Sequence, residues 1–189
     1  MSSSLSPGVW LDGVLPVNAA LGSGTVLIGD DAFKRFQSKR DSALVVGMNC
    51  TLDGVQLATG TGGHIEIGDY CHLSSTILLA EVSLRIGSYV IIGWNTTIAD
   101  CDFHPMDPAL RIEDAIACYT LSQGRTRPPA LTAPIDIGDN VFIGPCVAIL
   151  KGVRIGERAF IEPGSVVTRD VPARARVLGN PARIVGEEA

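Results

Sequence analysis

The chain has 189 residues and a formal net charge of −5, so it lacks the basic surface that a nucleic-acid-binding protein needs. Hydrophobic residues make up 46% of it but aromatic residues only 5%, and 21 glycines and 11 prolines indicate many corners and few long helices. No apolar stretch is long enough to span a bilayer, and residues 1–7 lack the basic and apolar regions of a signal peptide. We therefore expect no nucleic-acid or membrane partner and a cytoplasmic location.

The cysteines indicate neither a disulfide framework nor a metal cluster. There are five of them, an odd number, and none forms a C-x-x-C pair. The five are Cys50, Cys71, Cys101, Cys118 and Cys146. The sequence therefore predicts no metal ligands.

Residues 1–45 are predicted to form an irregular N-terminal segment. Ile28-Gly-Asp-Asp-Ala32 fits one unit of the repeat described below, and Ile28 lies 18 residues before Val46. The next two equivalent positions are Lys34 and Arg40, whose charges cannot fill an apolar interior. We expect at most an edge strand here, at the end of the repeat.

A six-residue repeat begins at Val46. It is seen in Val46-Gly-Met-Asn-Cys50, Ile67-Gly-Asp-Tyr-Cys71 and Ile86-Gly-Ser-Tyr-Val90. The steps between these units are not all multiples of six, which predicts small corner insertions near residues 58–64 and 81–84. Cys50 and Cys71 fall in a column of small residues, so they are interpreted as core hydrophobes.

The repeat is most regular from residue 137 to residue 172. Every first position is aliphatic, and every fifth position is small: Ile137, Ile143, Ile149, Ile155, Ile161 and Val167, then Val141, Val147, Val153, Ala159, Ser165 and Val171. An α-helix cannot keep positions six apart on one face, and a simple strand alternates with a period of two. A triangular solenoid satisfies the pattern, because each hexapeptide supplies one short strand and one corner. We therefore predict an all-β parallel β-helix domain over residues 46–172.

Residues 103–134 interrupt the repeat and are predicted to form a long protruding loop. Its prolines stiffen it, and it contains Arg111. At its root, Asp102 and His104 project to the same side if the strand continues. A carboxylate beside an imidazole can fix its tautomer, and an imidazole suits general-base chemistry. The alternative is that His104 only anchors the loop at a corner, and His64 and His72 are interpreted as surface or corner residues.

With these residues in view, the chain resembles the hexapeptide-repeat acyltransferases, in particular the maltose and galactoside O-acetyltransferase-like branch. The resemblance rests on Ile86 to Pro105, on Pro134 to Pro172, and on Leu178-Gly-Asn-Pro-Ala-Arg-Ile-Val185 in the short C-terminal tail, residues 173–189. It implies a left-handed β-helix, a homotrimer with active sites between subunits, and transfer of an acyl group from acetyl-CoA to a sugar or similar small acceptor. His104 would be the general base and Asp102 its orienting partner.

The resemblance also suggests binding residues. For the cofactor they are Gly144, Ala148, Gly164, Ser165, Thr168, Arg169 and Arg183; for the acceptor they are Ser74, Ser75, Trp94, Asn95, Phe142 and Arg111. The chain departs from the family in having Leu73-Ser-Ser75 where relatives carry an acceptor-binding Asn, and in carrying Glu162 where a small residue is usual. These departures leave the acceptor and the shape of the cofactor groove open.

Two other functions are alternatives to acyl transfer. A zinc-dependent carbonic anhydrase of the left-handed helix type needs three converging histidine ligands, and the spacing of His64, His72 and His104 does not provide them. A non-catalytic solenoid scaffold would require neither the His-Pro loop nor the family tail. Acyl transfer without a required metal is therefore the favoured prediction.

Overall fold

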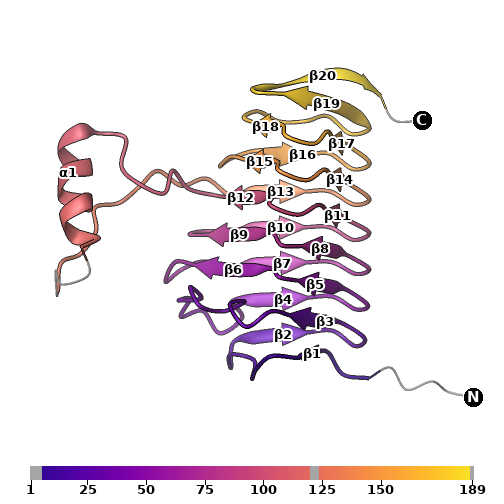
Figure 1. Ribbon diagram of the computed structural model, residues 1–189, viewed down its shortest axis with the longest axis horizontal. Coiled ribbons are helices and arrows are strands. Elements are labelled where there is room, and N and C mark those ends of the chain that lie inside the picture. The colour runs from indigo at the N-terminus through magenta and orange to yellow at the C-terminus, as the bar shows by residue number, and fades with distance from the viewer. Residues whose placement is uncertain (1–5, 120–123, 188–189) are drawn as a thin grey trace, which may run out of the picture.

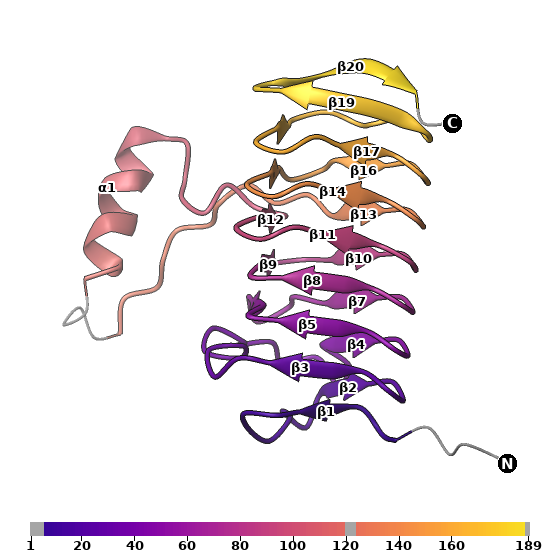
Figure 2. The same cartoon turned by 45° about the vertical axis from the view of Figure 1, so that its right-hand side comes forward.

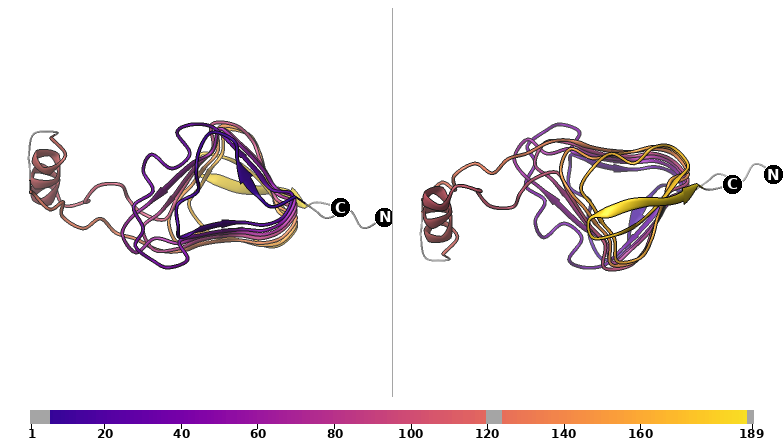
Figure 3. Two further views of the ribbon diagram at one scale, coloured as in Figure 1. Left: turned by 90° about the horizontal axis from the view of Figure 1, so that it is seen from below. Right: turned by 90° about the horizontal axis from the view of Figure 1, so that it is seen from above.

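In the computed structural model, residues 6–119 and 124–187 are described, and they form a parallel β-solenoid of about seven turns with one excursion (Figure 1). The predicted left-handed hexapeptide-repeat fold is confirmed. Seen along its axis, the solenoid is a three-sided prism (Figure 3). Among the described helices, none has the length and apolar character of a membrane-spanning segment.

Three sheets form the sides of the prism, with parallel pairing except between the last two strands, β19 and β20, and Figure 2 shows the strands stacked coil upon coil. The nine-stranded face contains β1 (Val9–Trp10), β3 (Val26–Ile28), β5 (Thr51–Asp53), β8 (His72–Ser74), β11 (Ile91–Ile92), β14 (Phe142–Ile143), β17 (Phe160–Ile161), β19 (Ala175–Gly179) and β20 (Ala182–Glu187). The six-stranded face contains β2 (Ala19–Leu21), β4 (Leu44–Val46), β7 (Ile65–Ile67), β10 (Leu84–Ile86), β13 (Ile135–Ile137) and β16 (Arg154–Ile155). The five-stranded face contains β6 (Gln56–Thr59), β9 (Ile77–Ala80), β12 (Thr97–Ala99), β15 (Ala148–Ile149) and β18 (Val166–Val167).

The core follows the six-residue rule read from the sequence. All six aliphatic first positions from Ile137 to Val167 and all six small fifth positions from Val141 to Val171 are buried. Cys50 and Cys71 are buried free thiols in the same interior, as predicted. The neighbouring Cys50 thiol and burial among aliphatic side chains raise the pKa of Cys71, which keeps it protonated.

The N-terminal segment differs from the expectation of an irregular structure. Strands β1, β2 and β3 lie within residues 1–45, and β2 and β3 pair in parallel with β4 and β5. Ala32 is still buried in the core, but Lys34 and Arg40 are exposed, because the chain after Ala32 runs along the edge of β6, where the Thr59 N–H donates to the Arg35 carbonyl. A parallel bridge between Phe36 and Thr59 joins this segment to the five-stranded face.

The fifth-position column allows a test of the register. Ala159 is 1% exposed, so Ala159→Phe places an aromatic ring where the narrow interior has room for a methyl group. We expect a loss of about 1–3 kcal/mol in the free energy of unfolding, because the overpacked coil must shift its neighbours. Thermal melting measures this loss, and a melting temperature equal to that of the wild type would contradict the assigned register.

Candidate active site

The excursion leaves the solenoid after β12 and returns before β13 through a narrow neck. The two sides of the neck form an antiparallel bridge between Cys101 and Thr132. The Asp102 N–H donates to the Leu131 carbonyl at 3.0 Å, and the Ala133 N–H donates to the Asp100 carbonyl at 2.8 Å. The neck therefore fixes the start of the excursion, where His104 lies, to the corner of the prism.

Beyond the neck the chain forms α1 (Pro108–Ala117), which stands away from the solenoid (Figures 1 and 2). This helix lies where only a loop was predicted, although its start is marked in the sequence. The carboxylate of Asp107 caps the helix by accepting hydrogen bonds from the N–H groups of Ala109 and Leu110, and Pro108 occupies the first turn. Asp-Pro before an amphipathic stretch is a helix-start signal.

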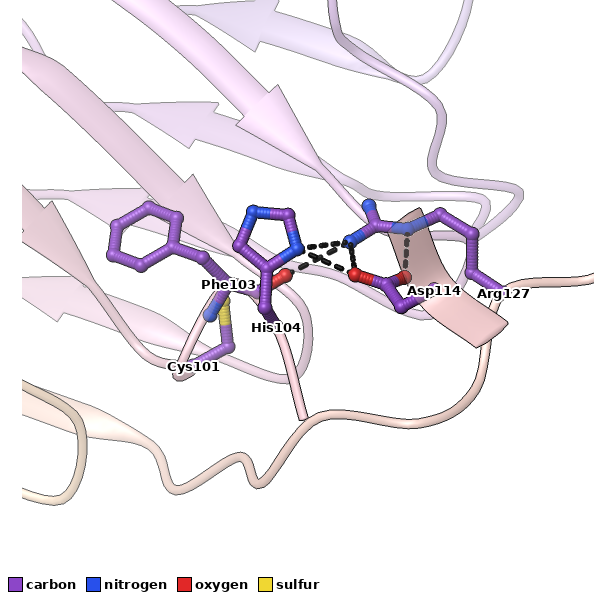
Figure 4. A network of polar contacts seen from close by, with 5 residues as sticks. All are labelled: Cys101, Phe103, His104, Asp114 and Arg127. Atoms are coloured by element: carbon purple, nitrogen blue, oxygen red, sulfur yellow. Dashed lines mark hydrogen bonds and ion pairs between the residues drawn. The ribbon is translucent and has the colours of Figure 1, made fainter. Parts of the chain in front are cut away.

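The helix carries Asp114 back to His104. The distance from His104 Nδ1 to Asp114 Oδ2 is 2.5 Å. Arg127, on the returning side of the excursion, donates from Nε to Asp114 Oδ1 at 2.6 Å and from Nη2 to the Phe103 carbonyl at 2.9 Å. Figure 4 shows the three side chains converging, with the second ring nitrogen of His104 pointing away from the carboxylate.

The tautomer of His104 follows from these contacts. Arg127 Nη2 also lies 3.2 Å from His104 Nδ1, but a guanidinium can only donate, and Nδ1 cannot accept from it while donating to Asp114. The contact of Nδ1 with the carboxylate is the shorter of the two, so we assign the proton to Nδ1, which donates a hydrogen bond to Asp114. Nε2 then presents a free lone pair.

Asp114 keeps its negative charge throughout the range in which an imidazole titrates. Hydrogen bonds from Arg127 and from His104 lower its pKa to about 2. The Asp114 side chain is only 1% exposed, although α1 lies outside the solenoid. Its carboxylate is in contact with Arg127 and His104. The site thus contains a fixed anion between an imidazole and a guanidinium.

Asp102 does not occupy the place predicted for it. Its carboxylate accepts a hydrogen bond from the Lys151 ammonium at 2.6 Å, so the carboxylate partner of His104 in this structure is Asp114. The reason is a change of direction: β12 already ends at Ala99, and Phe103 adopts a positive φ of 58°. The alternation of side chains that would put Asp102 beside His104 therefore does not hold.

A cavity of about 680 Å³ opens beside His104. Its floor is the outer surface of the five-stranded face, including Gln56, Ile77 and Thr97, and its rim includes Arg35 and Glu81. His104 and Arg127 border it on the side of the excursion. The cavity extends from His104 toward the N-terminal coils, and neither Arg35 nor Glu81 was predicted to belong to the site.

The outer surface of this face continues past His104 toward the C-terminal coils. Gln56, Ile77, Thr97, Ala148 and Val166 are in register on neighbouring strands and point outward. The coil that ends in His104 contains Thr97, so His104 divides the column into an N-terminal part in the cavity and a C-terminal part at Ala148 and Val166. One continuous face therefore leads to His104 from both directions.

The predicted cofactor residues lie in the last coils. Thr168, Arg169 and Arg183 surround a second cavity of about 290 Å³ at the C-terminal end. Gly164 lies at an open corner with a φ of 71°, whereas a Cβ on Gly144 would come within 2.7 Å of the Pro163 nitrogen, so tight coil stacking alone explains that glycine. Ser165 differs from the expectation because its hydroxyl is buried and accepts from the Gly179 N–H at 3.2 Å.

Glu162, a departure from the family pattern, is paired within the chain. Its carboxylate accepts hydrogen bonds from the Arg176 guanidinium, which lies 5.4 Å from the centre of the Phe160 ring. The positive charge of Arg176 therefore compensates the negative charge of Glu162, in the region where the cofactor groove was expected.

Most of the residues predicted to bind the acceptor lie away from His104 in the folded chain. Ser74 ends β8, and Ser75, Trp94 and Asn95 form turns at the corner between the nine-stranded and five-stranded faces. Phe142 lies on the nine-stranded face, stacked on Phe160 with ring centroids 4.4 Å apart. Arg111 is on α1, where Nη1 donates to the Met106 carbonyl at 2.7 Å. Within one chain the structure does not bring the first five together with His104.

The three histidines do not converge either. His72 is on the outside of the nine-stranded face and contacts Ser74, while His64 precedes β7 of the six-stranded face and contacts the Ser42 carbonyl. His104 follows the five-stranded face. Three histidines on three sides of one chain do not form the site that a carbonic anhydrase needs.

Comparison with known proteins agrees with the fold and the repeat. Residues 134–169 match the family model described as bacterial transferase hexapeptide (six repeats). The chain is 30% identical to galactoside O-acetyltransferase of Escherichia coli (strain K12) over 155 residues, which is 82% of this chain and 68% of the relative. It is also 30% identical to galactoside O-acetyltransferase of Lactococcus lactis subsp. lactis (strain IL1403) over 141 residues, or 74% of this chain.

A solved structure is similar over most of the chain. The hexapeptide-repeat-containing acetyltransferase of Vibrio cholerae O1 biovar eltor, complexed with acetyl coenzyme A, superposes with a TM-score of 0.56 at 29% identity and covers 72% of each chain. The present chain spans only 60% of the Lactococcus relative's length. It belongs to the hexapeptide-repeat acetyltransferase family.

Proposed function

We propose that this protein transfers an acetyl group from acetyl-CoA to a hydroxyl group of a carbohydrate or similar small acceptor, with His104 as the general base. The observation that carries the proposal is the arrangement of His104: its Nδ1 is held by Asp114, and its ring borders a cavity large enough for a sugar. The kinship with galactoside O-acetyltransferases supports the choice of acceptor.

The chemistry follows from the tautomer. Nε2 accepts the proton of the acceptor hydroxyl as that oxygen attacks the thioester carbonyl, and Asp114 stabilises the imidazolium that forms. A backbone N–H stabilises the oxyanion of the tetrahedral intermediate. When the intermediate collapses, the carbon–sulfur bond breaks, and the imidazolium returns its proton to the coenzyme A thiolate.

The two substrates approach along the five-stranded face from opposite directions. The acceptor lies in the cavity on the N-terminal side of His104, where Arg35, Gln56 and Glu81 offer polar groups. The pantetheine arm of acetyl-CoA lies on the C-terminal side, along Ala148 and toward the cavity around Thr168, Arg169 and Arg183. The reacting atoms then meet at His104.

The test of the proposed function is acceptor-dependent release of the coenzyme A thiol from acetyl-CoA. The panel contains neutral sugars, nucleotide sugars and amino sugars, so that hydroxyl and amine acceptors are compared. We expect release with at least one hydroxyl acceptor and formation of an ester. Release only with amines would replace O-acetylation by N-acetylation, and a chain that binds no acetyl-CoA would favour the scaffold function.

Arg183 provides a test of the donor site. Its guanidinium lies at the C-terminal cavity and can bind a phosphate of coenzyme A, far from the reacting thioester. We expect Arg183→Ala to raise the KM for acetyl-CoA by about tenfold, the loss of one charge-assisted hydrogen bond, while kcat at saturating donor changes little. An unchanged KM would remove Arg183 from the donor site.

We further propose that the active unit is a homotrimer. The excursion projects from one corner of the prism (Figure 3), and it exposes Ile112 on α1 at 65% and Tyr119 just after α1 at 61%, which a neighbouring copy would cover. A neighbour would also supply the corner with Ser74, Ser75, Trp94 and Asn95 to the groove beside His104. Sedimentation equilibrium tests the assembly: a mass of three chains is expected, and an active monomer would contradict it.

A further inference from the structure

The site around His104 also contains a cysteine, Cys118, that acyl transfer does not use. Cys118 follows α1 and lies four residues after Asp114, so the two side chains project from the same side of the helix. The ligating atoms of His104, Asp114 and Cys118 all lie within 4.8 Å of one another. Cys118 is an exposed, free cysteine, so its sulfur is accessible to solutes.

This combination of donor atoms suits zinc. Imidazole nitrogen, carboxylate oxygen and thiolate sulfur are the three ligand types that Zn²⁺ takes in proteins, and a water molecule completes the tetrahedron. Zinc bonds of about 2.0–2.3 Å place tetrahedral ligand atoms about 3.3–3.7 Å apart. Side-chain shifts of about 1 Å would therefore convert the observed cluster into a coordination sphere.

We propose that His104, Asp114 and Cys118 form an inhibitory Zn²⁺ site that blocks the base. The metal binds His104 at Nδ1, the nitrogen that now faces Asp114, and displaces the proton there. A neutral imidazole bound to metal at Nδ1 carries its proton on Nε2, so Nε2 cannot accept the acceptor's proton. The inhibition rests on the proposed function, whereas the metal site itself does not.

Arg127 sets the affinity of this site. Its Nε can keep the hydrogen bond to Asp114 Oδ1 while Oδ2 turns to the metal. Its positive charge nevertheless opposes the binding of a cation and holds Asp114 in the catalytic arrangement. The arginine thus favours the active form, and zinc must compete with it.

Binding is measured first, in the absence of coenzyme A, because the coenzyme thiol itself binds zinc. The probe is Co²⁺, which gives a thiolate-to-cobalt charge-transfer band only when a cysteine ligates it, followed by displacement with Zn²⁺. We expect one Co²⁺ per chain and a charge-transfer band that Cys118→Ser abolishes. Cys146→Ser, which changes an exposed cysteine at the corner between the nine-stranded and five-stranded faces, outside the cluster of His104, Asp114 and Cys118, is the matched control and should keep the band.

Affinity separates this site from adventitious binding. Cys118→Ser should weaken Zn²⁺ binding by about tenfold or more, since it removes the one sulfur ligand, and Arg127→Gln should strengthen it. A band that persists in Cys118→Ser, or the absence of any band in the wild type, would overturn the proposal.

Inhibition is then tested in the acetyl-transfer assay with buffered Zn²⁺. Each variant is compared with its own rate without metal. Cys118→Ser should need at least about tenfold more free zinc for half inhibition than the wild type and Cys146→Ser. Equal sensitivity of all three proteins would refute inhibition through this site. If the protein transfers no acetyl group at all, the cobalt measurement still decides whether the site exists.

Discussion

His104→Ala is expected to lower acceptor-dependent release of coenzyme A by about 10²- to 10⁴-fold, the contribution that a positioned general base makes. The fall should appear in kcat, because the imidazole acts in the transition state, while the KM for acetyl-CoA stays close to the wild-type value. The assay is thiol release at saturating donor with the best acceptor of the panel.

The matched control is His64→Ala. His64 lies before a strand of the six-stranded face, where it contacts the Ser42 carbonyl, so its removal leaves the five-stranded face unchanged. Thermal melting of both variants separates loss of the base from loss of the fold. A folded His104→Ala protein with wild-type turnover would show that His104 only anchors the loop.

The solenoid could be predicted from the sequence because its interior is narrow and repeats. Each buried position between Ile137 and Val171 sees the same surroundings one coil above and below, so the chain must repeat the same choice of residue. The prediction was weakest where the repeat is broken. In residues 1–45 the three strands could not be recognised, because Lys34 and Arg40 lie at positions that the repeat reserves for apolar residues, in a segment whose charged side chains stay outside the core.

The base could be predicted, but its partner could not. His104 lies directly after a clean repeat, so its position is set by local sequence. Asp114 and Arg127 reach it from 10 and 23 residues away, across a helix and an irregular returning segment whose path depends on the neck at Cys101 and Thr132. The spacing of residues in the sequence does not show that such distant segments come into contact. Asp102, the carboxylate nearest to His104 in the sequence, was therefore predicted as its partner.

The capping signal at Asp107-Pro108 would have improved this prediction. A helix starting at Pro108 puts Asp114 and Cys118 on one side and Ile112, Ile116 and Tyr119 on another. The pattern therefore distinguishes the side of the helix that contacts His104 from the side that a second copy could cover.

Asp114→Asn is expected to lower kcat/KM by about tenfold to a hundredfold, less than the loss of the base itself. The asparagine amide can donate to Nδ1 and so favours the wrong tautomer, and it cannot stabilise the imidazolium. The variant also frees Arg127, whose positive charge then faces His104 without compensation.

Thermal melting of the variant separates this role from a structural one. The pKa of Asp114 is lowered to about 2 from 3.8, so the carboxylate's contribution to stability is complete above about pH 4 and is lost only as the pH falls toward 2. In the wild type the anion is therefore present at every pH at which the enzyme is assayed. Replacing it by a neutral amide should lower kcat/KM throughout this range in a protein that stays folded, because the imidazolium that forms during the reaction has lost its stabilising charge.

Asp102→Asn is the matched comparison. It makes the same chemical change in the carboxylate that was predicted from the sequence to orient His104. The Asp102 carboxylate is held by Lys151, so this variant should keep a kcat/KM close to that of the wild type. A loss of kcat/KM in Asp102→Asn together with wild-type kcat/KM in Asp114→Asn would restore the assignment made from the sequence. A loss in Asp114→Asn alone would establish that a residue on the excursion, beyond the repeat, orients the base.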